Sequence, residues 1–435
     1  MKTKTTISVL IAFLLLIKSG INHAEGRKSL TLSESVDIAL QHSPFLKTSE
    51  LDVGAASEAL RASKGALFPR VDLAASYLRE NRNIPYIQAQ SVKIPPLFSD
   101  VIYASAVVLR MPIYEGGRLW GQVKVAELEK TIQSLRRDFT VQDVVANVTN
   151  TFNKLLQLKE FRVANLKSVQ ALERQERNTE LLVKAGRVAN VELMRVDVQL
   201  ASEKQNLERT DEAINRTRYG LAYLMGVDMS QVPDVEGSLS TQEKVVADDI
   251  EALIKTRSDV VAVSKRVEQA AKRVDVGSAR RYPSLAAVGS YGYKAGSHFN
   301  DRTDVGEVGV LFSINIFDGG IISSEIRREK ILHQRAQEEL RLALSRARLE
   351  VENALSSLRE ADYRQGVAQK AMVQSEEALR IEELKYKTGA GTVTDVLLAQ
   401  SAMSSAQANY YQALYDYNAA VTEFRRATGT MEVKR

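Results

Sequence analysis

The sequence predicts an internally duplicated α+β chain, in which long coiled-coil helices make up most of the mass and β-hairpins interrupt them. Three observations support this fold class: landmarks that occur twice, an apolar period that changes after two prolines, and long stretches without proline. The repeated unit is about 200 residues long, far longer than the units that build solenoid proteins. The repeat therefore indicates a duplicated domain within the 435 residues.

The landmarks of the first half return in the second half in the same order. They are FPRVDLAASY at 68–77 and YPSLAAVGSY at 282–291, PIYEGG at 112–117 and NIFDGG at 315–320, KAG at 184–186 and KTG at 387–389, and Asn215 with Gly226 against Asn418 with Gly429. We expect the first copy to span 25–226 and the second 248–429. A linker at 227–247 would join them, and 430–435 would form a C-terminal tail.

The first 24 residues are typical of a secretory signal peptide. Lys2 and Lys4 precede an apolar stretch at 7–17, which is too short to span a bilayer as a helix, and Ala24 is the expected cleavage position. No later segment approaches 18 uninterrupted apolar residues, so we expect no transmembrane helix. The chain has no cysteine, which excludes disulfides and a lipid anchor on an N-terminal Cys.

Each copy begins with a helix that ends ahead of a proline. The motif Thr31-Leu32-Ser33-Glu34 predicts a capping box that starts a helix over about 31–64. Its counterpart would cover about 249–279. Pro69 and Pro283 follow these helices, and proline fits the first position of a strand but not a helix interior.

After each of these prolines the apolar period changes to two. Val71, Leu73, Ala75 and Tyr77 alternate with other residues, and so do Val308, Val310, Phe312, Ile314 and Ile316. With less regular alternation at 103–113 and 285–293, this predicts β-hairpins at about 69–114 and 283–317, with strands of roughly 10 to 14 residues. Alternation of this kind also fits half-buried strands of a soluble sandwich.

Aromatic residues mark the places where a predicted strand meets a helix. These junction aromatics are Phe68, Tyr114, Tyr282 and Phe317. Aromatic rings gather at the edge of a bilayer, although each one taken singly also fits ordinary packing at a junction. Four apolar strands have little globular core to cover them, and lipid admits strands only as a closed barrel. Because four strands do not close a barrel, several copies of the chain would have to contribute.

Two proline-free stretches, 118–184 and 321–387, predict the long helices. At 1.5 Å per residue each helix would reach about 100 Å. Apolar residues at spacings of three and four indicate coiled coils. Each stretch ends at a glycine turn, and a returning helix follows over about 191–225 or 395–428. Each copy is then helix, hairpin, very long helix, tight turn and returning helix.

In this order and duplication the chain resembles the TolC-like outer-membrane efflux proteins over nearly all of the sequence after the signal. IYEGG and IFDGG at the strand ends carry the resemblance, together with glycine tips followed by VEL at 191–193 and TDVL at 394–397. The resemblance implies a homotrimer in which each protomer gives four strands to one 12-stranded transmembrane β-barrel. A hollow α-helical barrel would continue it through the periplasm.

The resemblance also implies a function. The protein would lie in the outer membrane of a Gram-negative bacterium and serve efflux or type I secretion. Substrates would come from an inner-membrane transporter of the RND or ABC type and pass a periplasmic adaptor protein on their way to the cell exterior. Small toxic compounds, metal ions and proteins are all exported in this way, and the transporter sets the choice.

By position, the resemblance assigns roles to residues at the two helix-turn-helix tips. The adaptor would contact Ala185, Gly186 and Arg187 at the first tip and Thr388, Gly389 and Ala390 at the second. The glycines also have a structural reason, because the end of a helix often needs a left-handed residue. Adaptor contact would therefore be an added role.

The resemblance further implies a periplasmic gate at Asp395 and Tyr386, with Glu192 in the equivalent place of the first copy. Three-fold symmetry would bring three Asp395 carboxylates into a ring, and such rings select or trap cations. Gly391 replaces the locking arginine of the family, and Leu398 stands where a second Asp would follow, so we expect one ring and a looser lock. A solvated Asp at a helix N-terminus is the other interpretation of Asp395.

Two other classes of protein compete with this interpretation. An enzyme would need a convergent polar cluster, yet the only histidines after the signal are His42, His298 and His333, and no catalytic, metal or phosphate motif appears. We therefore expect neither catalysis nor a cofactor. A secreted or periplasmic coiled-coil protein without a membrane barrel explains the helices but not the signal and paired hairpins together. Charges of both signs alternate along the chain, which argues against a nucleic-acid partner.

Overall fold

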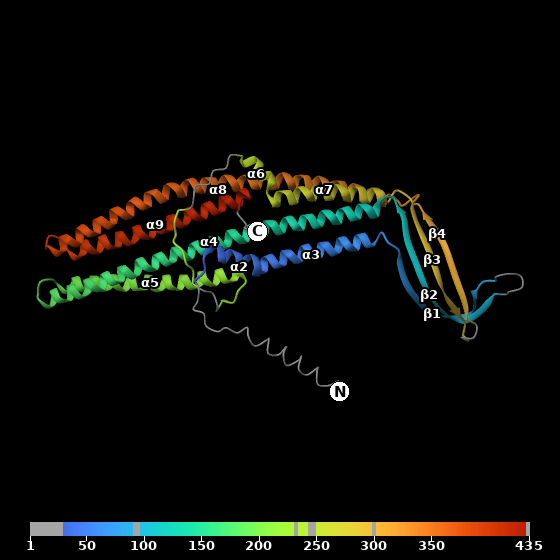
Figure 1. Ribbon diagram of the computed structural model, residues 1–435, viewed down its shortest axis with the longest axis horizontal. Coiled ribbons are helices and arrows are strands. Elements are labelled where there is room, and N and C mark those ends of the chain that lie inside the picture. The colour runs from blue at the N-terminus through green and yellow to red at the C-terminus, as the bar shows by residue number, and fades with distance from the viewer. Residues whose placement is uncertain (1–28, 90–95, 230–233, 242–248, 298–301, 432–435) are drawn as a thin grey trace, which may run out of the picture. The chain divides into compact units, whose positions relative to one another are not determined.

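The computed structural model describes residues 29–89, 96–229, 234–241, 249–297 and 302–431 (Figure 1). The predicted signal peptide lies outside these residues, as do His298 and parts of the predicted linker and tail. The elements of the first copy are α2 (Leu32–His42), α3 (Pro44–Gly65), β1 (Arg70–Ile87), β2 (Leu97–Glu115), α4 (Arg118–Lys184) and α5 (Asn190–Met225). Those of the second copy are α6 (Ile250–Thr256), α7 (Ser258–Ala279), β3 (Ser284–Ala295), β4 (Thr303–Ser313), α8 (Ile321–Lys387) and α9 (Val393–Thr428).

The two copies match element by element. Helices α3 and α7 both have 22 residues, α4 and α8 both have 67, and α5 and α9 both have 36. The long helices begin and end at the predicted residues, and each returning helix starts within two residues of its prediction. The predicted very long helices and tight turns are confirmed.

The expectation of one continuous first helix is wrong in both copies. The capping box at Thr31 is confirmed, with the Glu34 backbone N–H donating to Thr31 Oγ1 at 3.3 Å, but α2 ends at His42. Ser43 is extended, because the proline that follows it disfavours helical geometry there. In the second copy the break falls at Arg257, between α6 and α7.

The chain forms two compact units, one of 1–46, 141–247 and 352–435 and the other of 47–140 and 248–351. In the first unit, α2, α4 and α5 meet around a core that includes Phe152, Leu155, Leu221 and Met225. Gly226 ends α5 with φ +71°, and a Cβ there would lie 2.3 Å from the carbonyl oxygen of His42. Only glycine fits this left-handed residue at such a close approach.

The second unit contains a four-stranded antiparallel sheet in the order β1-β2-β3-β4 (Figure 1). Strands β1 and β2, at 18 and 19 residues, are longer than expected, and β3 and β4 have 12 and 11. Between the landmarks at 68–77 and 112–117 the first copy has more residues than the second copy has between the corresponding landmarks, and these residues lengthen the β1–β2 hairpin. Strand β4 ends at Ser313, opposite the first residue of β3, although the alternation continues to Ile316.

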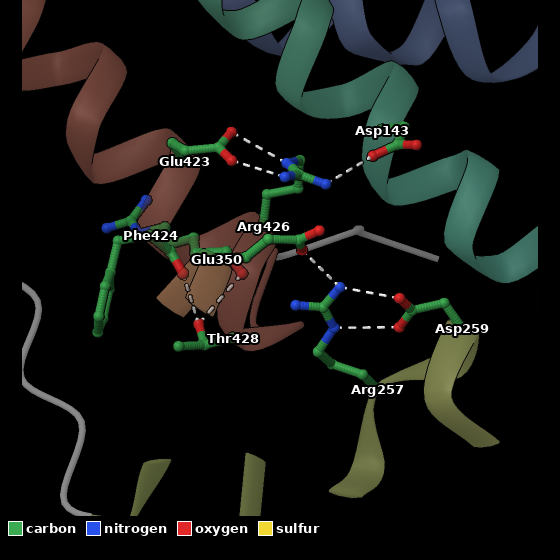
Figure 2. Close-up of polar contacts among 9 residues, drawn as sticks. Asp143, Arg257, Asp259, Glu350, Glu423, Phe424, Arg426 and Thr428 are labelled. Atoms are coloured by element: carbon green, nitrogen blue, oxygen red, sulfur yellow. Dashed lines mark hydrogen bonds and ion pairs between the residues drawn. The ribbon is translucent and has the colours of Figure 1, made fainter. Parts of the chain in front are cut away.

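A buried arginine joins helices within the second unit. The side chain of Arg257 is 2% exposed, and its Nε and Nη2 donate to the two carboxylate oxygens of Asp259 at 3.0 and 2.8 Å (Figure 2). Nη2 also donates to Glu350 Oε2 at 2.8 Å. Burial works against the charge, but the bonds to both carboxylates outweigh it and raise the pKa of Arg257. The break between α6 and α7 is thereby fastened to α8.

A second arginine, Arg426, forms ion pairs within the first unit. Arg426, in the last turn of α9, donates to both carboxylate oxygens of Glu423 at 2.9 and 2.6 Å and to Asp143 Oδ1 of α4 at 3.3 Å (Figure 2). A cation in this position also faces the negative end of the helix dipole. The bond to Asp143 orients α9 against α4 near the C-terminal end of α9, while the two bonds to Glu423 lie within α9.

Candidate functional site

The register of the sheet separates two faces of different chemistry. One face carries Val71, Leu73, Ala75 and Tyr77 of β1, Tyr103, Ser105, Val107, Leu109 and Met111 of β2, Leu285, Ala287, Gly289, Tyr291 and Tyr293 of β3, and Gly306, Val308, Val310 and Phe312 of β4. We call it the apolar face. The residues just named are uncharged, and the register adds the charged Arg79 of β1 and Asp304 of β4 at the loop end of this face. Its large side chains are exposed, with Leu73 at 79% and Val308 at 93%. None of the residues that the structure describes covers these side chains, so the face is suited to contact with an apolar medium.

The opposite face, here the charged face, carries Arg70, Asp72, Arg110, Lys294 and Glu307. Arg70 lies directly opposite Arg110 on the neighbouring strand, and its Nε donates to Asp72 Oδ1 at 2.9 Å. Asp72 and Glu307 lie at the next level along the strands. The residues between the charges include the small Ala74, Ala106 and Gly292 and the larger Val108 and Val288. This face presents fixed charges to water rather than a packed core.

Aromatic rings stand at both ends of the apolar face. The junction aromatics Phe68, Tyr114, Tyr282 and Phe317 are all exposed, beside the ends of the strands that lead to the helices. At the hairpin-loop end, the rings of Tyr77 and Tyr103 lie 5.2 Å apart, and the Arg302 guanidinium sits 4.9 Å from the centre of the Tyr293 ring.

Of these two belts of aromatic rings, the sequence predicted only the one formed by the junction aromatics. The belt at the loop end was missed because its tyrosines come together only through strand pairing. Tyr103 and Tyr114 are about 11 residues apart on β2, which is roughly 36 Å along a strand and about 25 Å for a strand tilted by 45°. That height matches the apolar band of a membrane sheet.

The predicted adaptor-contact residues all lie on two exposed helix-turn-helix tips of the first unit. At the first tip Gly186 has φ +69°, and its N–H and that of Arg187 donate to the carbonyls of Val183 and Leu182. At the second tip Gly389 has φ +79°, with the Ala390 N–H on the Lys385 carbonyl at 2.9 Å. Both turns are closed by left-handed glycines. At the second tip the Thr388 hydroxyl also donates to the carbonyls of Leu384 and Lys385, at 3.1 and 3.0 Å.

The predicted gate residues lie beside the tips but differ in their contacts. Asp395 is exposed and completes a capping box at the start of α9, where it accepts from the Thr392 N–H at 3.0 Å and from Thr392 Oγ1 at 2.7 Å. The side-chain bond from Thr392, followed by the backbone bond, lowers the pKa of Asp395. The structure therefore also fits the other interpretation of Asp395, which is a solvated Asp at a helix N-terminus.

Glu192 and Tyr386 have polar atoms that are buried without a hydrogen-bond partner, Glu192 Oε2 and the Tyr386 hydroxyl. Glu192 Oε1 accepts from Arg195 at 3.1 Å, and Arg195 also donates to Thr394 Oγ1 at 2.8 Å. Arg195 therefore links the start of α5 to the start of α9. Sequence reasoning missed Arg195, and its only signal was the three-residue spacing from Glu192.

Polar side chains also lie between the helices above the tips. A cavity of about 570 Å³ between α4, α5 and α9 is lined by residues such as Asn165, Ser404 and the 5% exposed Glu203. Nearby, Gln157 donates to Gln412 at 2.8 Å across the α4–α9 contact. Buried amides in a coiled coil fix which residues face each other, at a cost in stability. They therefore specify one pairing of these helices.

Two classes of site are not found among the described residues. Within the described ranges, no helix combines the length and apolar character needed to cross a membrane. In the same parts of the chain, no three His, Asp or Glu side chains gather in a way that would hold a metal ion.

Comparisons with known proteins agree on one family. The family model described as outer membrane efflux protein matches residues 36–227 and 250–430. The outer membrane protein TolC of Vibrio cholerae is 22% identical over 414 residues, which cover 92% of this chain and 91% of that protein.

Solved structures show the same fold. The Campylobacter jejuni CmeC outer membrane channel superposes with a TM-score of 0.80 at 17% identity, covering 92% of this chain and 87% of that one. The Vibrio cholerae outer membrane protein VceC gives 0.76 at 21% identity, covering 92% and 96%.

Proposed function

The chain belongs to the outer membrane efflux protein family, and from this premise we propose how its surfaces make a conduit. The protein is an outer-membrane channel for efflux or type I secretion, and its long helices form a large periplasmic portion. Members of this family are channel proteins. We propose that the working form is a homotrimer that takes substrates from an inner-membrane transporter of the RND or ABC type through a periplasmic adaptor.

The observation that carries the proposal is the sheet with one apolar and one charged face. A four-stranded sheet leaves two edge strands, and lipid tolerates no open edge. Three protomers supply twelve strands, enough to close a barrel with the apolar face toward lipid. Arg70 and Arg110 would then face the water-filled interior. A coiled-coil protein without a membrane barrel gives no reason for either face.

The periplasmic tips are the proposed docking site for the adaptor. The six predicted tip residues are exposed, and the turns are rigid because each has a left-handed glycine bonded back to its helix. Arg187 at the first tip has Ala390 as its counterpart at the second. A trimer would therefore present two kinds of tip in alternation, of which the first carries one more positive charge than the second.

We propose that Asp395, Tyr386 and Glu192 belong to the periplasmic gate. Asp395 keeps its charge because Thr392 stabilises the carboxylate, so a trimer would carry a ring of three negative charges. Arg195 takes the part of the missing lock, because its bond to Thr394 joins the two helix pairs of one protomer at the gate. Replacing Arg195 by Ala should then increase single-channel conductance.

One experiment tests the function as a whole. The protein extracted in detergent is weighed by light scattering, and its conductance is recorded in planar lipid bilayers. We expect a trimer that produces stable single-channel currents. An elongated monomer that stays in solution without detergent, and that gives no current, would refute the proposal.

A further inference from the structure

The apolar face of the sheet carries a pocket near the hairpin loops, which we call the loop-end pocket. Its volume is about 500 Å³. Two rows of the strand register run through it, and its lining includes Tyr77, Tyr103 and Ala295 from one row and Ala75, Ser105 and Tyr293 from the next. Each row combines tyrosine with small residues, and the small side chains leave the hollow between the rings.

A cation closes one side of the loop-end pocket. Arg302 also lines it, and the register places this residue beside Ala295, one step past the pair of Lys294 with Thr303. The Arg302 guanidinium lies 4.9 Å from the centre of the Tyr293 ring. A guanidinium held against an aromatic face keeps N–H donors for a phosphate, whose oxygens match its planar fork. The pocket therefore joins aromatic walls to a positive charge.

The rings of the pocket are held by one another. The centres of the Tyr77 and Tyr103 rings are 5.2 Å apart, and the Tyr293 ring meets the edge of Tyr291 at 6.3 Å. Tyrosine has an apolar ring and a polar hydroxyl, so it suits a boundary between lipid and water.

The pocket lies where the apolar band of the sheet gives way to polar chain. Leu73, two residues before Ala75 on β1, is 79% exposed on the apolar face. On the other side of the pocket, the pairing of β1 with β2 is interrupted between Arg79 and Ile84, and residues 80–83 read ENRN. Because the helices are periplasmic, the hairpin loops lie at the outer side of the membrane. The loop-end pocket is therefore at the level of the outer headgroups.

Positive charge predominates at this end of the apolar face. Among the residues that the structure describes, Arg79 and Arg302 are joined there by one acidic residue, Asp304. Asp304 lies opposite Tyr293 but is not among the residues that line the pocket. A basic site at headgroup level attracts an anionic lipid.

We propose that the loop-end pocket binds the phosphorylated sugar headgroup of an outer-leaflet glycolipid, with Arg302 on a phosphate and the tyrosine rings against the sugar; this rests on the barrel proposed above, which turns the apolar face to lipid. A phosphate alone would fill only a small part of about 500 Å³. A sugar ring lies flat against an aromatic ring, and its hydroxyls can bond Ser105 and the tyrosine hydroxyls. The acyl chains of the same molecule then cover the exposed Leu73.

Native mass spectrometry of the detergent-solubilised trimer tests this site, because each bound lipid adds a known mass. The probe is lipid A, an acylated disaccharide with two phosphates. We expect up to three copies per trimer. Arg302→Gln should weaken binding at least about tenfold, which is the scale of a lost hydrogen bond to a charged group. Lipid A from which both phosphates have been removed should bind the wild-type protein about as weakly.

The matched control is Lys294→Gln. It removes one positive charge from the row next to Arg302, but Lys294 belongs to the charged face. We expect this variant to bind lipid A within about twofold of wild type, because a charge on the far face makes no direct contact. Equal losses in Arg302→Gln and Lys294→Gln would show that binding follows net charge, and they would overturn the proposal.

Two further probes decide the source of the phosphate. Phosphatidylglycerol has an anionic headgroup without the disaccharide, and equally tight binding of it would overturn the assignment to a glycolipid. Displacement of lipid A by an excess of inorganic phosphate would also overturn it, since the site would then hold the anion alone.

Light scattering and bilayer conductance separate a failure of this site from a failure of the proposed function. A monomer that gives no current would refute the barrel and the pocket together. A conducting trimer that binds intact and dephosphorylated lipid A equally, or that loses nothing in Arg302→Gln, would overturn the pocket alone.

Discussion

The buried guanidinium of Arg257 allows a quantitative test of what fastens the helix break in the second unit. Its three hydrogen bonds run to Asp259 and Glu350, and its side chain is 2% exposed. Arg257→Met keeps the apolar stem but leaves the two carboxylates without their cation. Breaking a buried ion pair costs about 3–5 kcal/mol. The carboxylates are 34% and 32% exposed, so water can partly solvate them, and we expect the lower value of about 3 kcal/mol.

The assay is hydrogen exchange followed by mass spectrometry, because a chain of two units need not unfold in one step. A loss of about 3 kcal/mol corresponds to roughly 150-fold faster exchange through local opening in α6 and α7. The matched control is Arg348→Met, which removes the exposed ion pair of Arg348 with Glu251 in the same unit. Exposed pairs are worth at most about 1 kcal/mol.

A third variant separates charge from packing. Adding Asp259→Asn and Glu350→Gln to Arg257→Met removes the uncompensated negative charges and should restore much of the protection. If Arg257→Met exchanges no faster than the Arg348→Met control, the buried cation does not hold this break. If the neutral triple variant is as unprotected as Arg257→Met, lost packing rather than unpaired charge is the cause.

Three further outcomes are expected. Gly226→Ala should lower the free energy of local opening by about 2–3 kcal/mol, because its Cβ meets the carbonyl oxygen of the last α2 residue. The uncrowded Gly186→Ala should cost about 1 kcal/mol, and hydrogen exchange at the end of α5 and at the first tip measures the two values. The pKa of Asp395 is lowered in the folded state, so its carboxylate stabilises the second tip above its ordinary pKa of 3.8 and loses this effect as the pH falls through the lowered pKa. Asp395→Asn should therefore loosen a nitroxide label at Ala390→Cys at pH 7 but not at pH 2, and equal mobility at pH 7 would count against the cap. Arg110→Glu should shift the reversal potential of the channel in a salt gradient toward cation preference, and an unchanged potential would place Arg110 outside the ion path.

The sequence was sufficient for the long helices because their signals are local. Proline and glycine mark where α4 and α8 begin and end, and three- and four-residue spacings fill the length between them. The first helices were predicted less well. The break at Ser43 had a signal in Pro44, but the break at Arg257 has none, because a buried ion pair with Glu350 of a distant segment stabilises it.

The candidate sites divide in the same way. The tip residues lie where the glycine turns predicted them, since a left-handed residue is a property of the local chain. Arg195 was missed because its partner Thr394 belongs to the other copy, about 200 residues away, and only helix packing brings them together. The second aromatic belt was missed for the same reason, because strand pairing places Tyr77 beside Tyr103.

By itself the sequence determined the duplication, the order of elements in each copy and the positions of the turns, because period, proline and glycine act over a few neighbouring residues. The tertiary structure decided the strand register, and with it which face of the sheet is apolar and which is charged. Register depends on partners far away in the chain.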